Sequence, residues 1–354
     1  MVATTSTGNE LTWPTIFTEL LSGQSLGQAE AVWAMDQIMS GEASPAQVAG
    51  FLMALRAKGE TVEEMRGLAD TMLAHASRIE VAGTTLDIVG TGGDRAHTVN
   101  ISTMASLVAA ACGVRVVKHG NRSSSSSSGS ADVLEALGIN LALPSAAVVT
   151  VAEQVGITFC FAQHFHPAMR HAASARRDLG IGTAFNFLGP LTNPAQPTYA
   201  AIGVADARMA PLMAGVFAGR NKDAAVFRGD DGLDELTIST TSKVWWVRNG
   251  SVREYQVDPT SVGLDLHPVE SLRGADAAYN AQVVRDVFAG AVGPVRDAVV
   301  LNAGVALALT VPDRGQSQSD FTQALRLGMD RAGAAVDNGA ATSVLRNWVA
   351  ATTA

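Results

Sequence analysis

The sequence predicts an α/β protein with a small N-terminal helical lobe, residues 12–82, and a large α/β lobe, residues 83–354, built on a mainly parallel central sheet. A chain of 354 residues is too long for one ordinary compact domain. Its composition, 47% hydrophobic and 16% charged, is that of a chain that folds. Helical patterns fill the first 80 residues, whereas short apolar runs alternate with helical patterns after about residue 83.

The helical lobe carries recognisable helix starts and stops. Val32, Met35 and Ile38 recur at helical spacing before Gly41. Residues 44–47 form a capping box with proline at the first helical position. A second box at 61–64 precedes another apolar helical pattern, so we expect at least three helices in this lobe.

The second lobe opens with a strand, a helix and a strand. Residues 86–89 form a short apolar run, a helical pattern follows over 102–112, and residues 114–117 form the next run. This is a βαβ unit, so the two strands are expected to be parallel. The other expected elements are strands at 157–161, 200–204, 224–227 and 298–301, a hairpin over 243–253 turning at Asn249 and Gly250, and helices from Ser319 onward.

Composition and charge exclude several classes of protein. Lys and Arg number 25 against 33 Asp and Glu, so the net charge is −8 and we expect no nucleic-acid partner. Two cysteines and no CxxC rule out a disulfide framework and a cysteine zinc site. The longest uncharged stretch, 179–205, contains three prolines, so we expect no membrane span. No basic residue precedes Arg56, which is untypical of a secretory signal and predicts a cytoplasmic protein.

Two loops at expected strand ends carry the candidate chemistry. Residues 90–94 include three glycines, whose backbone N–H groups can approach an anion closely. They match neither standard nucleotide-binding fingerprint, and a tight strand-to-helix turn would show the same glycines. The second loop has Lys118, Arg122 and the serines at 123–128. Cations and hydroxyls suit a phosphate-rich ligand, and a flexible serine linker is the alternative.

Three further groups of residues have either a structural role or a role in binding a ligand. Ser102 stands at a helix start, where it is either a helix cap or part of an anion or magnesium site. Asp234 and Glu235 follow a strand. Adjacent acids are common in solvated loops, but opposite a pyrophosphate they would be hard-oxygen ligands for Mg²⁺. His164 and His166 have no further ligand at a suggestive spacing, so we expect them to be structural or pocket-lining.

Together these motifs resemble the anthranilate phosphoribosyltransferase family. Five motifs stand in register from about residue 15 to 345, at 90–94, 100–103, 118–121, 165–170 and 234–235. The resemblance implies a nucleoside-phosphorylase-like phosphoribosyltransferase fold and a homodimer formed through the helical lobe. We expect helical segment 164–180 to pack with residues 12–82 as part of this lobe. It implies transfer of a phosphoribosyl group from phosphoribosyl pyrophosphate to the amine of anthranilate, with two Mg²⁺ ions accompanying the pyrophosphate.

The resemblance also assigns site residues. Those expected to bind phosphoribosyl pyrophosphate are Gly90, Gly93, Asp94, Thr98, Asn100, Ile101, Ser102, Thr103, Lys118, His119, Gly120, Asn121, Arg122, Ser123, Ser124, Ser125, Ser126 and Ser130. Mg²⁺ would be shared by Ser102, Asp234 and Glu235, and anthranilate would lie near Gly90, His119, Asn121 and Arg176, with Arg177 as the alternative carboxylate anchor. Departures from the family pattern, from which we expect changed loop mobility or affinity, are Arg95, His97, Ser124 and Ser127.

No general base is assigned, since no Ser-His-Asp or Cys-His arrangement stands out and an aromatic amine is neutral near pH 7. Catalysis would rest on positioning and on charge stabilisation by Lys118 and Mg²⁺ around an oxocarbenium-like transition state. Two alternatives stay open. A pyrimidine nucleoside phosphorylase-like enzyme shares the Lys- and Ser-rich loop chemistry but fits residues 100–103 and 234–235 less well. A non-catalytic nucleic-acid-binding relative should be basic and lack these acids.

Overall fold

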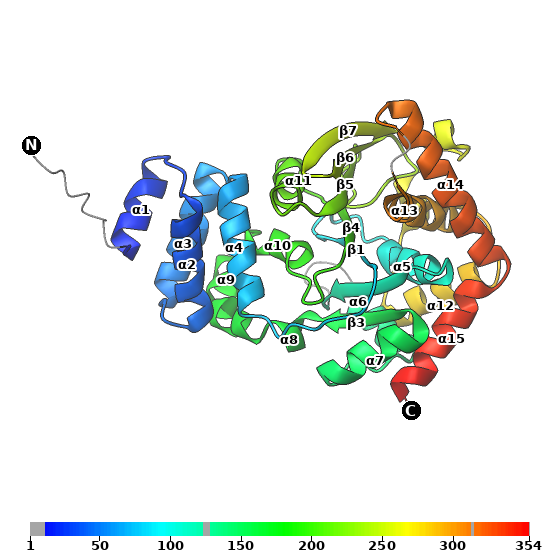
Figure 1. Ribbon diagram of the computed structural model, residues 1–354, viewed down its shortest axis with the longest axis horizontal. Helices are drawn as coiled ribbons and strands as arrows, with labels where there is room; N and C mark the ends of the chain where they lie inside the picture. The colour runs from blue at the N-terminus through cyan, green and yellow to red at the C-terminus, as the bar shows by residue number, and fades with distance from the viewer. Residues whose placement is uncertain (1–10, 123–127, 313–314, 354) are drawn as a thin grey trace, which may run out of the picture. The chain divides into compact units, whose positions relative to one another are not determined.

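The chain folds into two compact units (Figure 1). The computed structural model describes residues 11–122, 128–312 and 315–353. The first unit comprises the chain up to residue 76 together with 166–188, and the second comprises 77–165 and the chain from 189 onward. Each unit is therefore assembled from segments that are far apart in the sequence.

The first unit is helical. Its elements are α1 (Trp13–Leu21), α2 (Gln28–Ser40), α3 (Pro45–Lys58), α4 (Val62–Ala74), η1 (Pro167–Ala172), α9 (Ala173–Leu179) and α10 (Phe185–Leu188). The predicted helix boundaries are confirmed: α2 ends at Gly41 in the left-handed conformation, and the Ser44 hydroxyl accepts from the backbone N–H of Gln47 at the start of α3.

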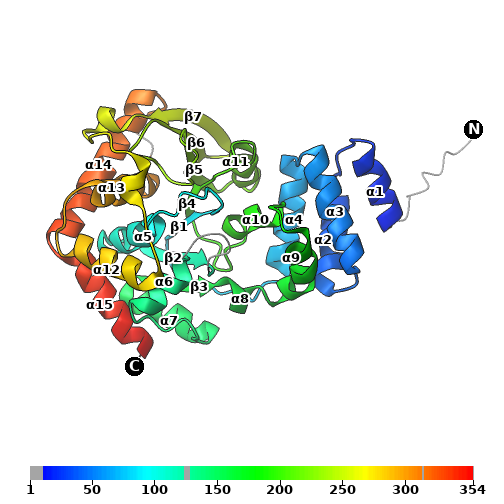
Figure 2. The same ribbon diagram turned by 180° about the vertical axis from the view of Figure 1, so that it is seen from behind.

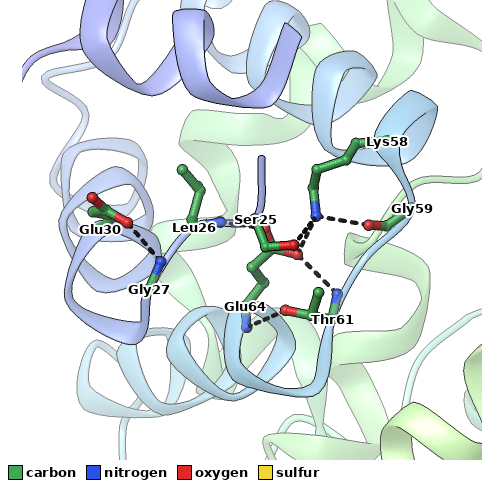
Figure 3. Close-up of polar contacts among 8 residues, drawn as sticks. All are labelled: Ser25, Leu26, Gly27, Glu30, Lys58, Gly59, Thr61 and Glu64. Carbon is green, nitrogen blue, oxygen red and sulfur yellow. Dashed lines mark hydrogen bonds and ion pairs between the residues drawn. The ribbon is translucent and has the colours of Figure 1, made fainter. Parts of the chain in front are cut away.

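A fully buried acid, Glu64, ties the first unit together (Figure 3). Its Oε2 accepts from the backbone N–H of Thr61 at 2.8 Å, which completes the predicted capping box of α4. The same carboxylate accepts from the Leu26 N–H and from the Lys58 ammonium, each at 2.8 Å. Lys58 also donates to the Gly59 carbonyl at 2.8 Å. One carboxylate thus links the start of α4 to the end of α3 and to the connection between α1 and α2.

The second unit is built on a mixed sheet. In the described residues it contains seven strands in the order β3-β2-β1-β4-β5-β6-β7. The strands are β1 (Thr85–Gly90), β2 (Arg115–Gly120), β3 (Ile157–Phe161), β4 (Tyr199–Gly203), β5 (Asp223–Gly229), β6 (Ser242–Arg248) and β7 (Ser251–Val257). The first five are parallel, and β6 and β7 are antiparallel additions at one edge. Because the chain order reverses between β1 and β4, ligands are expected beyond the carboxyl ends of these two strands.

Helices cover both faces of the sheet. Helices α5 (Ile101–Ala111) and α13 (Pro294–Leu309) pack on one side and α11 (Met209–Gly219) on the other, as Figures 1 and 2 show. The remaining elements of this unit are α6 (Ser130–Ala136), α7 (Ser145–Val155), α8 (Ala162–Phe165), η2 (Gly189–Leu191), η3 (Pro259–Val262), η4 (Val269–Leu272), α12 (Ala277–Phe288), α14 (Gln318–Asp337) and α15 (Ala340–Thr353). Within the described ranges, no helix combines the length and apolar character needed to cross a membrane.

The α/β class with a mainly parallel sheet is confirmed, and one predicted element is wrong. Residues 298–301, expected to form a strand, lie in α13, which is buried at every position from Ala298 to Leu309. A helix without an exposed face has no polar stripe, so four of its residues look like a buried strand. The predicted hairpin is confirmed: β6 and β7 meet at Asn249 and Gly250, both with positive φ.

Candidate active site

The candidate site lies at the carboxyl ends of β1 and β4, where Gly90 and Gly203 are register partners. Asp234 packs against both. A Cβ on Gly203 would lie 1.6 Å from the Asp234 carbonyl oxygen, and a Cβ on Gly90 would lie 2.2 Å from Asp234 Oδ2. Gly203 must therefore be glycine because the backbone of the acid segment touches it, and a side chain at Gly90 would displace the Asp234 carboxylate. Sequence reasoning selected Gly90 but missed Gly203, whose role depends on strand pairing.

Asp234 and Glu235 are buried acids, and burial destabilises their charged forms. Burial and the neighbouring Asp94 raise the pKa of Asp234 to about 7, although its Oδ2 accepts from the Gly92 N–H at 2.6 Å. Burial and the Asp234 charge raise the pKa of Glu235 well above its usual range. A cation beside them would remove this penalty. Buried carboxylates next to a serine hydroxyl are donors that suit Mg²⁺.

The described residues contain no group of three His, Cys, Asp or Glu side chains that could hold a metal. Mg²⁺ sites commonly use one or two carboxylates and complete the shell with water and ligand phosphates, so the acid pair still fits this ion. The nearby Asp230 and Asp231 have other roles. Asp231 accepts from the Thr237 hydroxyl at 2.6 Å, and Asp230 accepts from the Thr241 hydroxyl, so both stabilise the loop itself.

Lys118 supplies a buried cation at the end of β2. Its Nζ donates to the Ile88 carbonyl and lies 3.3 Å from the Ser102 hydroxyl, at the first turn of α5. Burial lowers the pKa of Lys118 to about 8, while the charges of Asp87, Glu235 and Asp234 act against that shift. The lysine, the helix start and the acid pair, predicted separately, are thus brought together in one unit.

Asp87 and Asn193 hold the end of β2 and were missed by sequence reasoning. Asp87 Oδ1 accepts from the His119 N–H at 3.1 Å, and Oδ2 accepts from Asn193 Nδ2 at 2.8 Å. Asn193 also donates to the Val117 carbonyl at 2.7 Å. His119 Nδ1 lies 2.9 Å from the Gly189 carbonyl, so this nitrogen carries the ring proton. An acid inside an apolar strand run was the available signal for Asp87.

The glycine-rich loop after β1 has an unusual backbone. Gly92, Gly93, Arg95 and His97 all have positive φ, between 53° and 90°. Positive φ at alternate positions turns successive N–H groups toward one side and forms an anion-binding concavity. Arg95 and His97, the departures from the family pattern, adopt a conformation that glycine adopts at lower cost, so the loop is strained at both positions.

The segment before α5 is held by side-chain amides. Asn100 Nδ2 donates to the Ser128 carbonyl at 3.1 Å, and Asn280, from α12, donates to Asn100 Oδ1 at 2.9 Å. Thr98 forms an isolated bridge with Arg273. The other predicted residues of this segment, Ile101, Ser102 and Thr103, form the first turn of α5, with Ile101 and Thr103 buried.

The loop after β2 is described in part. Ser123, Ser124, Ser125 and Ser126, together with Ser127, lie outside the described residues. Arg122 forms ion pairs with Asp132 at 2.9 Å and Glu135 at 2.6 Å, so its charge is already compensated. Asn121 is exposed and accepts from the Arg122 N–H, and Ser130 opens α6. Of the two predicted cations of this loop, Lys118 is therefore the better placed for a ligand.

Arg176 and Arg177, both in the first unit, differ in how far their side chains are buried. Arg176 is half-buried over the Phe185 ring, 5.5 Å from its centroid, and burial lowers its pKa. Arg177 is 78% exposed and lies 3.9 Å from Asp178. Gly90, His119 and Asn121, predicted to act with Arg176, belong to the second unit.

The helical bundle and the α/β unit each match a domain of a glycosyl transferase family. Residues 14–76 match the glycosyl transferase family, helical bundle domain, and residues 82–342 match the glycosyl transferase family, a/b domain. An anthranilate phosphoribosyltransferase from Nocardioides sp. is 62% identical over 341 residues, which cover 96% of this chain and 99% of that protein. The chain therefore belongs to the anthranilate phosphoribosyltransferase family, an enzyme family of tryptophan biosynthesis.

Solved structures agree over the full length. The anthranilate phosphoribosyltransferase of Thermus thermophilus has a TM-score of 0.87 at 39% identity, covering 96% of this chain and 99% of that one. The Saccharomyces cerevisiae enzyme, in complex with phosphoribosyl pyrophosphate and Mg, has a TM-score of 0.87 at 27% identity, covering 98% and 99%. The predicted family is confirmed, and the comparisons support neither alternative.

Proposed function

We propose that the second unit binds phosphoribosyl pyrophosphate through the loop after β1, the first turn of α5 and the loop after β2. The reaction is the transfer of the phosphoribosyl group to the amine of anthranilate, giving N-(5-phosphoribosyl)anthranilate and pyrophosphate, the second step of tryptophan synthesis from chorismate. The observation that carries the proposed site is the convergence of Lys118, Ser102 and the acid pair beside β1 and β4. The yeast relative bound to phosphoribosyl pyrophosphate supports it.

Two Mg²⁺ ions would accompany the pyrophosphate, held by Ser102, Asp234 and Glu235. Because burial and neighbouring acids raise the pKa of both acids, a cation would stabilise their charged forms, which supports this assignment. When bound, the ions would neutralise the charge that builds up on the departing pyrophosphate. The yeast relative, solved with Mg, supports the choice of metal.

The protein's own contribution is positioning and charge. Lys118 faces the start of α5, where backbone N–H groups and the helix dipole also favour an anion. Asp87 and Asn193 fix the backbone beside Lys118, so the cation needs little reorganisation when the leaving group becomes more negative. The attacking aromatic amine is neutral near pH 7, so no side chain is assigned as general base.

Arg176 is the proposed partner of the anthranilate carboxylate. A half-buried guanidinium loses less hydration on binding an anion than the exposed Arg177 does. We expect Arg176→Ala to raise the KM for anthranilate at least tenfold and to leave the Kd of phosphoribosyl pyrophosphate within twofold of wild type. Arg177→Ala is the matched control and should change neither constant by more than twofold. A larger effect on the anthranilate KM from Arg177→Ala would reverse the assignment.

The experiment that tests the proposed function follows anthranilate fluorescence with purified protein, Mg²⁺ and phosphoribosyl pyrophosphate, omitting each in turn. The fluorescence should decay only when all three are present. If the protein binds phosphoribosyl pyrophosphate but the fluorescence does not decay, the proposed phosphoribosyl pyrophosphate site stands and anthranilate is not the acceptor.

The helical unit is the proposed contact surface of a homodimer, and the cytoplasm is the proposed location. The dimer rests on the family resemblance, and the location rests on the family's part in tryptophan biosynthesis. Light scattering on the purified protein should give twice the chain mass of 36.6 kDa. A mass of one chain across the micromolar range would refute the dimer.

A further inference from the structure

Asn302, a fully buried residue of α13, binds the backbone next to the acid pair. Its Oδ1 accepts from the Leu236 N–H at 2.9 Å, and its Nδ2 donates to the Leu236 carbonyl, also at 2.9 Å. Nδ2 donates as well to the Ala298 carbonyl in the same helix at 2.9 Å. The amide therefore pairs with both backbone groups of the residue that follows Glu235, as a neighbouring strand would.

The acid segment is anchored on both sides of Asp234 and Glu235. Before them, the Leu233 carbonyl accepts from the Gly229 N–H at 3.0 Å, so this side is held by its own loop. After them, Asn302 holds Leu236, and the Thr237 N–H donates to the Ser242 hydroxyl at 3.0 Å. Asn302 thus links this segment to α13, a buried helix of the core.

Helix α13, which carries Asn302, is held in place by close packing against α14. It packs against α14 at a point where glycines meet. A Cβ on Gly328 would lie 2.2 Å from the Gly304 carbonyl oxygen, and a Cβ on Gly304 would lie 2.6 Å from Met329 Cγ. The backbones of the two helices therefore approach closely, and Asn302 stands two residues before this contact.

We infer that Asn302 is a positioning residue that holds Asp234 and Glu235 in the arrangement that binds Mg²⁺ with phosphoribosyl pyrophosphate. The inference rests on the proposed metal site. Without the amide, the N–H and carbonyl of Leu236 lose their buried partner and the segment can shift. Groups that orient metal ligands affect metal affinity by roughly 10–100-fold.

The test substitutes Asn302→Leu, which has a similar size and no hydrogen-bonding group. Calorimetry gives the Kd of phosphoribosyl pyrophosphate with Mg²⁺ and with a chelator, in the absence of anthranilate. We expect the Kd with Mg²⁺ to rise about tenfold, the Kd with chelator to stay within twofold, and the anthranilate KM to stay within twofold. Added Mg²⁺ should recover part of the loss, because the weakened step is metal binding.

Leu325→Ala, at a buried apolar position of α14, is the control for lost core stability. If Asn302→Leu weakens binding equally with and without Mg²⁺, or acts as Leu325→Ala does, Asn302 is merely structural and the inference is wrong. If Asn302→Leu does not fold by circular dichroism, Asn302→Ser decides by the same two Kd values.

The acid variants separate this inference from the proposed metal site. Asp234→Asn and Glu235→Gln are measured in parallel with the asparagine variants. If neither acid variant changes the Kd with Mg²⁺, the proposed metal site itself is wrong. If they do and the asparagine variants do not, only the inference about Asn302 fails.

Discussion

Glu64 in the helical unit and the Asp234–Glu235 pair in the α/β unit are all buried acids, but the fold treats them differently. Both oxygens of Glu64 have donors, among them two backbone N–H groups and the Lys58 ammonium. Asp234 accepts from the Gly92 backbone N–H, but burial and the like charge of Asp94 raise its pKa to about 7. Glu64 is thus stabilised within the protein, whereas the charged forms of the acid pair stay disfavoured by burial even beside Lys118, and a bound cation would offset this cost.

The difference separates an acid that stabilises the fold from acids that we propose to bind a metal with its ligand. A carboxylate with a complete set of donors makes its surroundings rigid. A buried carboxylate whose donors do not offset the cost of burial lowers stability, and such groups are concentrated at functional sites. Three predictions test the distinction.

The largest expected effect is on stability. Glu64→Ala leaves the Lys58 ammonium buried without its partner, so the free energy of unfolding should fall by about 4 kcal/mol. Denaturant titration followed by circular dichroism measures the change. Glu63→Ala, on the exposed side of the same helix turn, should cost less than about 0.5 kcal/mol. Equal losses in the two variants would show that the Glu64 cluster does not stabilise the unit.

The next effect is on activity. Asp234→Asn should lower kcat/KM for phosphoribosyl pyrophosphate on the order of 100-fold, equivalent to about 2.7 kcal/mol, because the proposed metal loses a charged ligand. The same change should raise the stability of the metal-free protein at pH 8, since a penalised charge is removed. Asp230→Asn, an acid of the same loop that bonds Thr241, is the control and should keep its activity. Lower stability of Asp234→Asn at pH 8 would contradict the comparison.

The smallest effect, taken per pH unit, is the pH dependence of stability. The pKa of Asp234 rises from 3.8 to about 7 on folding, so between these values the folded protein binds more protons than the unfolded chain. Stability of the metal-free protein should therefore fall as pH rises from about 4 to 7, by at most about 1.4 kcal/mol per pH unit for this group, and level off above pH 7. Thermal unfolding of wild type and Asp234→Asn should differ in this slope, and identical slopes would refute the raised pKa.

Much of the local structure could be predicted from the sequence. The caps at Ser44 and Thr61 and the hairpin at Asn249 depend on near neighbours, and all three are confirmed. The candidate loops were recognisable because glycine, lysine and paired acids stand directly after apolar runs. Residues 298–301 were misread because a buried helix and a buried strand have the same composition.

The sequence by itself determined the class of fold and the family, because these depend on local patterns and motif order, and it predicted the candidate site residues. Only the tertiary structure decided that Gly203 must be glycine and that Asn302 binds the backbone of the acid segment. It also decided that Asp87 and Asn193 bind each other beside β2. Asp87 and Asn193 are 106 residues apart in the chain, and Asn302 and Leu236 are 66 residues apart. Only packing brings them together, and packing also sets the burial that raises the pKa of the acids.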